Sequence, residues 1–266
     1  MRSRPLHALA VIALATILTG CAVTSMEVLP PDALTAVTAW PVSGRQGWMP
    51  GRKLRFGDYV TRDLTKRQET KQVACPNGCS GVDLGIYRRH FDEAFRTATQ
   101  RMHYTLAGPA GAEVDVQLIT QIDQQRRDWI TRWLGMPTEA GGDVSRQIAV
   151  IGTLRTADDR QPPWRFALRD GASNGAALQG WAEDEHGRRL VLTPLRKVAG
   201  RQAGLPLQAP ATMTLGYAFE LDGRTVGAVS TVGPGQVWID PDAAPDLRLS
   251  VAGLASALLL QSPLMR

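Results

Sequence analysis

Strict alternation of apolar and polar residues is the clearest pattern in this chain. Every second residue from Met213 to Leu221 is apolar, and Asp222-Gly223 follows directly. An Asp-Gly pair between two alternating runs is the strongest short signal for a hairpin with a two-residue turn. That turn would place Phe219 opposite Val226. We therefore expect a β-hairpin here with one apolar core face.

Shorter runs with the same character recur along the chain. They cover residues 54–64, 114–118, 148–154, 164–168 and 237–239. Short apolar runs separated by Gly and Pro turns are typical of antiparallel strands. The pattern predicts a β-rich α+β fold, with an antiparallel sheet that is curved or packed as a sandwich and is covered by helices.

Two segments have helical patterns. Apolar residues at 91, 94, 95, 98 and 102 follow helical spacing, which predicts an amphipathic helix over about 86–102. Asp92 and Glu93 would lie near its start, where the helix dipole favours negative charge. Residues from Leu247 to Leu260 are apolar nearly all round, but they number about fourteen, too few to span a bilayer. They predict a buried helix over about 247–260.

A third segment combines aromatic and basic residues. Trp129 and Trp133 are four residues apart, as on one face of a short helix, and Arg126, Arg127 and Arg132 would lie on its other side. Such a helix could contact an anionic membrane surface or a partner protein. The alternative is a helix that closes one end of the sheet with both Trp rings inside the core.

The first residues have a pattern of their own. Two arginines precede an apolar run from Leu6 to Leu18, which is again too short to span a bilayer. A basic start, a short apolar run and small residues before a cleavage point describe a secretory signal. The sequence Leu18-Thr19-Gly20-Cys21 resembles the lipobox of bacterial lipoproteins.

That resemblance implies an anchor and a compartment. Residues 1–20 would be a cleaved signal peptide, and Cys21 would become the first mature residue, carrying the acyl chains. Several acyl chains together hold a protein permanently in a bilayer. The lipid bilayer would therefore be a partner of this chain, bound through the acylated Cys21. Ala22, in place of Asp, favours the outer membrane over inner-membrane retention, with the domain in the periplasm.

The mature chain divides into two regions. Residues 21–50 contain frequent Pro and Gly and read as a lipidated N-terminus and tether. Residues 51–266 would then form a single β-rich domain, or two subdomains with a break near 156–162. The formal net charge is +5, and removal of Arg2 and Arg4 with the signal leaves +3. So mild a charge argues against nucleic acid as a partner.

The remaining two cysteines are close together. Cys75 and Cys79 flank Pro76-Asn77-Gly78, which favours a tight turn. In an oxidising envelope we expect them to form a disulfide. A redox pair and a metal half-site are the alternatives, although thioredoxin-like motifs have two intervening residues rather than three.

Sequence motifs for catalysis are missing from the chain. His90, His103 and His186 are the mature histidines, and no Gly-x-Ser-x-Gly, His-Glu-x-x-His or nucleotide-binding motif occurs. The segment from Glu183 to Gly187 is a metal or acid-base candidate, but it matches a solvated hairpin tip better. We expect no catalytic residues, no metal and no cofactor, and therefore a protein that is not an enzyme.

Three functions follow from these expectations. The first is a non-catalytic outer-membrane lipoprotein that binds or scaffolds an envelope protein or an anionic envelope component. The second is a carrier of an apolar or glycan ligand in a pocket beneath the curved sheet. The third is an envelope hydrolase. A pocket lined by the 213–219 face would favour the carrier, whereas a filled core there would favour the scaffold.

Overall fold

The computed structural model describes residues 27–45, 53–75, 80–83, 87–133, 136–157, 161–169, 179–199, 207–210 and 214–261. These residues form mostly strands, two short 3-10 helices (η) and one long helix. In chain order the elements are η2 (Asp32–Leu34), β1 (Trp40–Pro41), β2 (Arg55–Phe56), β3 (Tyr59–Ala74), β4 (Ser80–Asp83), β5 (Tyr87–Ala107), η3 (Pro109–Gly111), β6 (Glu113–Trp133), β7 (Met136–Thr156), β8 (Trp164–Arg169), β9 (Gln179–Glu183), β10 (Arg189–Leu195), β11 (Lys197–Val198), β12 (Leu207–Gln208), β13 (Gly216–Leu221), β14 (Arg224–Ser230), β15 (Gln236–Ile239) and α2 (Pro245–Leu260). The predicted β-rich α+β class is confirmed.

One antiparallel sheet of thirteen strands dominates the molecule. Its order is β1-β15-β14-β13-β10-β9-β8-β7-β6-β5-β3-β2, with β4 paired to β5 off this path, while β11 and β12 form a separate pair. The two edge strands of the sheet, β1 and β2, approach each other. Ser43, just after β1, accepts a backbone hydrogen bond from Arg55 of β2 at 3.0 Å and donates one to it at 2.9 Å. The curved sheet is therefore nearly closed.

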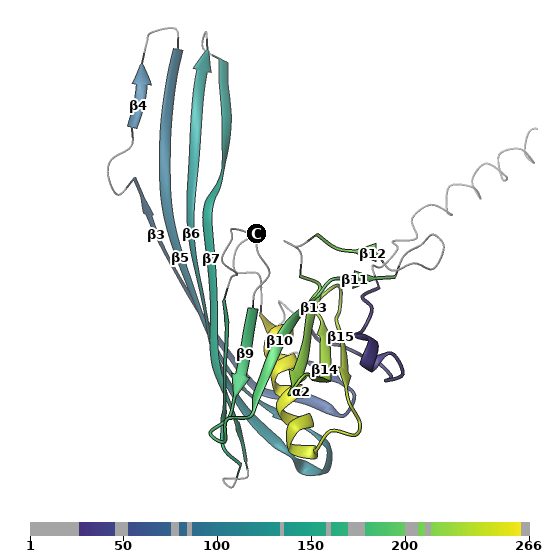
Figure 1. Ribbon diagram of the computed structural model, residues 1–266. Coiled ribbons are helices and arrows are strands. Elements are labelled where there is room, and N and C mark those ends of the chain that lie inside the picture. The colour runs from purple at the N-terminus through teal and green to yellow at the C-terminus, as the bar shows by residue number, and fades with distance from the viewer. Residues whose placement is uncertain are drawn as a thin grey trace, which may run out of the picture.

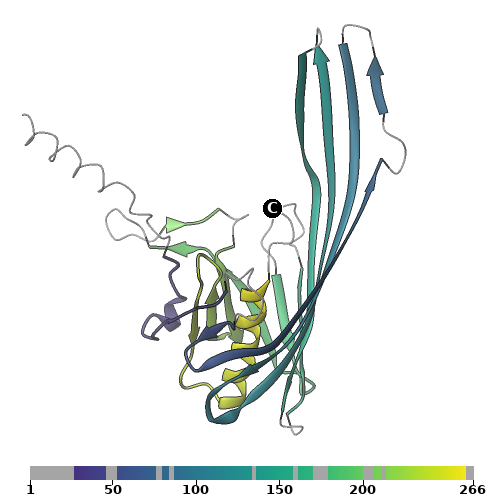
Figure 2. The ribbon, with the colours of Figure 1, turned by 180° about the vertical axis from the view of Figure 1, so that it is seen from behind.

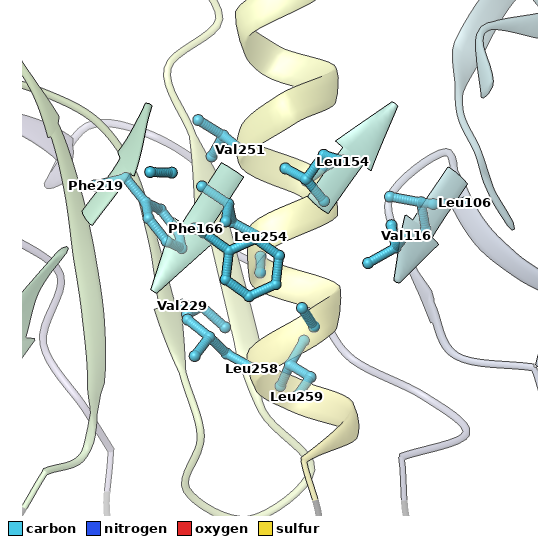
Figure 3. Close-up of a cluster of buried hydrophobic side chains, with 14 of the residues drawn as sticks. Leu106, Val116, Leu154, Phe166, Phe219, Val229, Val251, Leu254, Leu258 and Leu259 are labelled. Atoms are coloured by element: carbon cyan, nitrogen blue, oxygen red, sulfur yellow. The ribbon is translucent and has the colours of Figure 1, made fainter. Parts of the chain in front are cut away.

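Helix α2 lies inside the curve of the sheet (Figures 1 and 2). Twelve of its sixteen residues are buried, on all sides of the helix. Figure 3 shows Val251, Leu254 and Leu258 of α2 among side chains of the sheet, such as Leu154 and Phe219. The predicted buried helix over 247–260 is confirmed. An apolar helix is stable there because the concave face of the sheet surrounds it.

A second apolar cluster lies on the opposite face of β13, β14 and β15. Val28 and Leu34, in the segment before β1, pack there with Ala218, Ala228 and Trp238. These three strands are consequently buried on both faces, one against α2 and one against the N-terminal segment. Residues that sequence reasoning assigns to a tether are thus part of the packed structure.

Four strands continue beyond this core as a long arm (Figures 1 and 2). We define the arm as residues 68–74 of β3, 87–99 of β5, 121–133 of β6 and 136–149 of β7, together with β4. The ladder between β5 and β6 is continuous from Tyr87 opposite Trp133 to Ala107 opposite Glu113. Every residue of β3 from Arg62 to Ala74 is exposed, so this edge of the arm has water on both faces.

The helix predicted over 86–102 is wrong, because these residues belong to β5. Ala94, Ala98 and Met102 are spaced by four, an even number, so they lie on one face of a strand as readily as on one face of a helix. Ala98 and Met102 are buried, whereas Phe95, the intervening member of the stripe, is 40% exposed on the other face. Hydrogen-bonded ladders to β3 and β6 on both sides determine the outcome.

The basic helix predicted around Trp129 and Trp133 is also wrong. Both residues lie in β6, where Trp129 pairs with Phe91 of β5 and with Ala140 of β7. A helix this short is marginal on its own, because nucleation is unfavourable. The strand conformation gains a backbone ladder on each side.

The Asp-Gly hairpin is confirmed, with one difference in register. Asp222 and Gly223 both have positive φ, 52° and 77°, and Leu221 pairs with Arg224 as expected. A bulge after the second pair then moves Phe219 opposite Gly227 instead of Val226. Bulges of this kind add one residue to one strand and shift every later pair.

Candidate binding groove on the outer face of the sheet

The structure describes some of the site residues predicted from the sequence and leaves others outside its described residues. Cys21 and Cys79 lie outside the described residues, and Cys75 directly follows β3 with a positive φ of 47°. The Cys75–Cys79 disulfide therefore stays a prediction. Within the described residues, no helix combines the length and the apolar character needed to cross a membrane.

The predicted aromatic and basic contact residues lie on the arm. Arg126 binds Asp128 at 2.9 Å, and Arg127 binds Glu93 at 3.0 Å. Hydrogen bonds from Gln125 and Arg127 hold the pKa of Glu93 below its ordinary value. These two arginines are therefore engaged within the arm. Trp129, Arg132 and Trp133 are placed by their backbone in β6, and their side chains lie outside the described part.

Hydrogen bonds and ion pairs fix the hairpin tip between β9 and β10 to helix α2. Asp184 is buried and accepts hydrogen bonds from the N–H groups of His186 and Arg188, both at 2.9 Å. The Arg188 guanidinium binds Asp184 at 2.6 Å and Asp246 of α2 at 3.1 Å, and it lies 5.3 Å from the centre of the Trp164 ring. This network ties the tip to the first turn of α2.

Two of the three histidines, His103 and His186, have described side chains, and neither belongs to a described grouping suited to a metal. His103 lies 2.5 Å from Asp115, and His186 is exposed at the tip. The described residues contain no group of three or more His, Cys, Asp or Glu side chains placed to hold a metal ion.

An exposed apolar stripe crosses five strands on the face turned away from α2. Its members are direct register partners from β6 to β10: Ile119, Ile151, Ala167, Trp181 and Val191. Partners directly opposite each other in an antiparallel pair lie on the same face, so the stripe is continuous. Ile119 is 36% exposed, Ile151 55% and Val191 47%. Single exposed apolar residues are ordinary, but a contiguous set marks an interaction site.

The stripe forms the floor of two adjoining hollows, which together we call the transverse groove. One hollow, of about 790 Å³, extends from β3 to β9, and the other, of about 630 Å³, extends from β7 to β10. Ile151, Ala167 and Trp181 line both hollows. Ala167 has the smallest side chain in the stripe and sits between Ile151 and Trp181, which leaves the surface low at the centre.

Arginines surround this apolar floor. Five line the groove: Arg67, Arg101, Arg165, Arg169 and Arg189. The Arg189 guanidinium lies 5.3 Å from the centre of the Trp181 ring, which is cation–π distance. None of the described residues that line the groove is Asp or Glu. Glu69 lies beside it at 3.5 Å from Arg101, and Glu183 is the register partner of both Arg165 and Arg189.

This arrangement is suited to binding apolar and anionic groups. The floor can desolvate apolar groups, and the arginines can form bidentate hydrogen bonds with carboxylates or phosphates. The described groove lining includes His103, whose ring lies 2.5 Å from Asp115, and several threonine hydroxyls, but no Ser or Cys side chain. Sequence reasoning missed the stripe because each of its five members belongs to a different strand. Only the sheet order brings them together.

No protein-family model matches the chain, and neither a curated protein nor a solved structure matches it. The groove is therefore interpreted from its own residues and from the fold that positions them.

Proposed function

We propose that this chain is a non-catalytic, lipid-anchored protein of the bacterial envelope that binds an envelope partner through the transverse groove. The observation that carries the proposal is the exposed apolar stripe rimmed by five arginines. The partner that fits is a protein segment with apolar side chains and acidic flanks, because such a segment satisfies both the floor and the rim.

The filled interior supports a scaffold rather than a carrier beneath the sheet. Tyr217 and Phe219 of the predicted ligand-lining face are buried in the cluster that includes α2, and Phe219 is fully buried. Met213 lies outside the described residues. The hollow surface of the described sheet lies on its outer face, where a partner can approach without unfolding the core.

The anchor is the second part of the proposal and rests on the lipobox resemblance. Val28 is already packed against the sheet, seven residues after Cys21. Seven extended residues reach roughly 25 Å at most. An acylated Cys21 would therefore hold the domain close to the periplasmic side of the outer membrane, within reach of other envelope components.

Two experiments test the two parts separately. For the anchor, Cys21→Ala should move the protein from the membrane fraction to the soluble fraction and remove the acyl mass. Continued membrane fractionation of the variant would contradict the anchor.

For the groove, a photo-crosslinking amino acid at Ile151 should give one discrete adduct in living cells. Leu207, 60% exposed and away from the groove, is the matched control position and should give none. Trp181→Ala in the same protein should abolish the Ile151 adduct, because it removes the largest part of the floor. Equal adducts at both positions, or an adduct that survives Trp181→Ala, would overturn the groove as the partner site.

A further inference from the structure

Strand β8 lies at the centre of the transverse groove and forms the floor of a narrower furrow. Its residues alternate strictly between buried positions and positions on the outer face. Three successive outer positions are Arg165, Ala167 and Arg169; both arginines are exposed, and the small alanine between them is half-buried. Register partners of Ala167 stand on both sides, with Ile151 of β7 on one side and Trp181 of β9 on the other. The floor is therefore an apolar depression with a cation at each end.

The two arginines at the ends of the furrow can accept an anionic partner. Neither forms an ion pair with any residue that the structure describes. Arg169 has an uncharged residue as its register partner on each side. Glu183 is the register partner of both Arg165 and Arg189, so one carboxylate stands between two guanidinium groups there. Both ends of the furrow consequently favour carboxylates, with which arginine forms strong bidentate hydrogen bonds.

The dimensions of the furrow match those of an α-helix. The walls on β7 and β9 are two strand spacings apart, or roughly 10 Å, and a helix with its side chains is about 10–12 Å across. Along β8, alternate residues are about 6.8 Å apart, and residues four apart on a helix are about 6 Å apart along its axis. A helix parallel to β8 would thus place one residue over Ala167. The residues one turn before and one turn after it would then lie near Arg165 and Arg169.

An extended segment or an acyl chain suits the furrow less well than a helix. β8 is hydrogen-bonded to Ala149–Leu154 of β7 and to Gln179–Glu183 of β9, so its backbone groups are used within the sheet. An extended segment on this face would leave its own N–H and C=O groups over an apolar floor without partners, whereas a helix satisfies these groups internally. An acyl chain with one anionic end would leave one of the two arginines without a partner.

We propose that the segment recognised by the groove is an amphipathic α-helix of the partner protein that lies parallel to β8. A large apolar side chain of this helix fills the depression over Ala167, between Ile151 and Trp181. One acidic residue about four positions before it and another about four positions after it bind Arg165 and Arg169. This inference rests on the proposed function, because it concerns the same groove, and it adds the conformation, axis and sequence pattern of the bound segment.

Crosslinking along β7 tests the axis of the bound segment, with the full-length protein in living cells. Ala149, Ile151 and Thr153 are exposed on the outer face beside β8, and each can be replaced by a photo-crosslinking amino acid. Positions 149 and 153 are four strand residues apart, or about 14 Å. Mass spectrometric mapping of the adducts should join them to partner residues about nine apart in sequence, because a helix rises 1.5 Å per residue.

Other adduct patterns would separate this inference from the proposed function. A spacing of about four residues would identify an extended segment, and a partner residue shared by positions 149 and 153 would identify a segment that crosses the strands. Either result would overturn the helix parallel to β8 and leave the groove as the partner site. Absence of a discrete protein adduct at Ile151 would contradict the proposed function itself, and this inference with it.

Substitutions in β8 test the sequence pattern of the partner helix. Ala167→Ile fills the depression with a residue that suits a strand, and it should abolish the Ile151 adduct. Arg165→Glu/Arg169→Glu should lower the adduct yield at least about tenfold, because two attractions become repulsions. Lys71→Glu is the control and should leave the yield unchanged, since Lys71 is an exposed cation on the same face but outside the groove.

Far-UV circular dichroism and melting temperature should match among these variants, because the substituted side chains lie on the outer face. A full adduct yield in Ala167→Ile or in the double arginine variant would overturn the proposal. An equal loss of adduct in Lys71→Glu would overturn it as well, because the arginines of β8 would then have no specific role.

Discussion

A buried pair of hydroxyl groups gives a quantitative test of how α2 is held inside the sheet. Tyr104 of β5 and Ser256 of α2 are both fully buried, and their side-chain oxygens are 2.7 Å apart. The Ser256 hydroxyl also donates to the carbonyl of Gly253 at 2.8 Å. With that donor occupied, the Tyr104 hydroxyl must donate to Ser256. Burial raises the pKa of Tyr104, so the phenol stays neutral and keeps the proton that it donates to Ser256.

The two single substitutions should differ, because they leave different groups unsatisfied. Tyr104→Phe removes one hydrogen bond and leaves the Ser256 hydroxyl donating to Gly253, a loss of about 0.5–1.5 kcal/mol in the free energy of unfolding. Ser256→Ala leaves the Tyr104 hydroxyl buried without an acceptor, which costs about 1–3 kcal/mol. The double substitution removes that orphan group, so it should be more stable than Ser256→Ala alone.

Guanidinium denaturation followed by circular dichroism measures these differences, provided that the m-value stays constant. Ser250→Ala is the matched control: Ser250 is also a buried serine of α2, but its hydroxyl bonds to Asp246 of the same helix. We expect the control to change stability by less than about 0.5 kcal/mol, because alanine is the better helix former. Strictly additive effects of Tyr104→Phe and Ser256→Ala, or a larger loss for Tyr104→Phe, would refute the proposed donor and acceptor roles.

Two further substitutions probe the tip of the β9–β10 hairpin and the packing of α2. Burial raises the pKa of Asp184, but hydrogen bonds from Arg188 and from neighbouring N–H groups outweigh it and hold the pKa below its ordinary value. The stabilisation is therefore present above the ordinary carboxyl pKa of about 3.9 and is lost as pH falls through the lower folded-state pKa. Asp184→Asn should lower the free energy of unfolding by about 1–3 kcal/mol at neutral pH. It should also flatten the acid side of the curve of stability against pH, and an unchanged acid side would contradict this reasoning. A Cβ on Gly227 would lie 2.5 Å from Cγ1 of Val251, so Gly227→Ala should lower the unfolding free energy by about 1–3 kcal/mol. Gly142→Ala is the control and should have little effect, because a Cβ there would have no atom within 4 Å. Equal denaturation midpoints for the two glycine variants would show that α2 is not packed closely against β14.

Local signals in the sequence predict the elements that depend on local physics. The Asp222-Gly223 turn needs two positive φ angles, and that residue pair adopts them readily, so the hairpin could be identified. The helix from Pro245 to Leu260 could be identified because its apolar run, from Leu247 to Leu260, is too long for a typical strand and too short to span a bilayer. Both are properties of a few neighbouring residues.

The arm could not be predicted in the same way, because its strands are unusual in length and composition. β5 has 21 residues, whereas strands in globular proteins average five or six. Over such a length, polar residues occupy both faces and the period of two is hidden. The remaining apolar residues at 94, 98 and 102 then fit helical spacing equally well. The ladders to β3 and β6 decide between the two conformations, and they join residues far apart in the chain.

The groove is formed by residues from strands that are even further apart in the chain. Their positions determine which parts of the molecule a bound partner would contact. Its row of register partners begins at Arg67 and Arg101, where the arm leaves the core, and continues through Ile119 and Trp181 to Val191 in the short strands. A partner in the groove would therefore contact the base of the arm and the domain together.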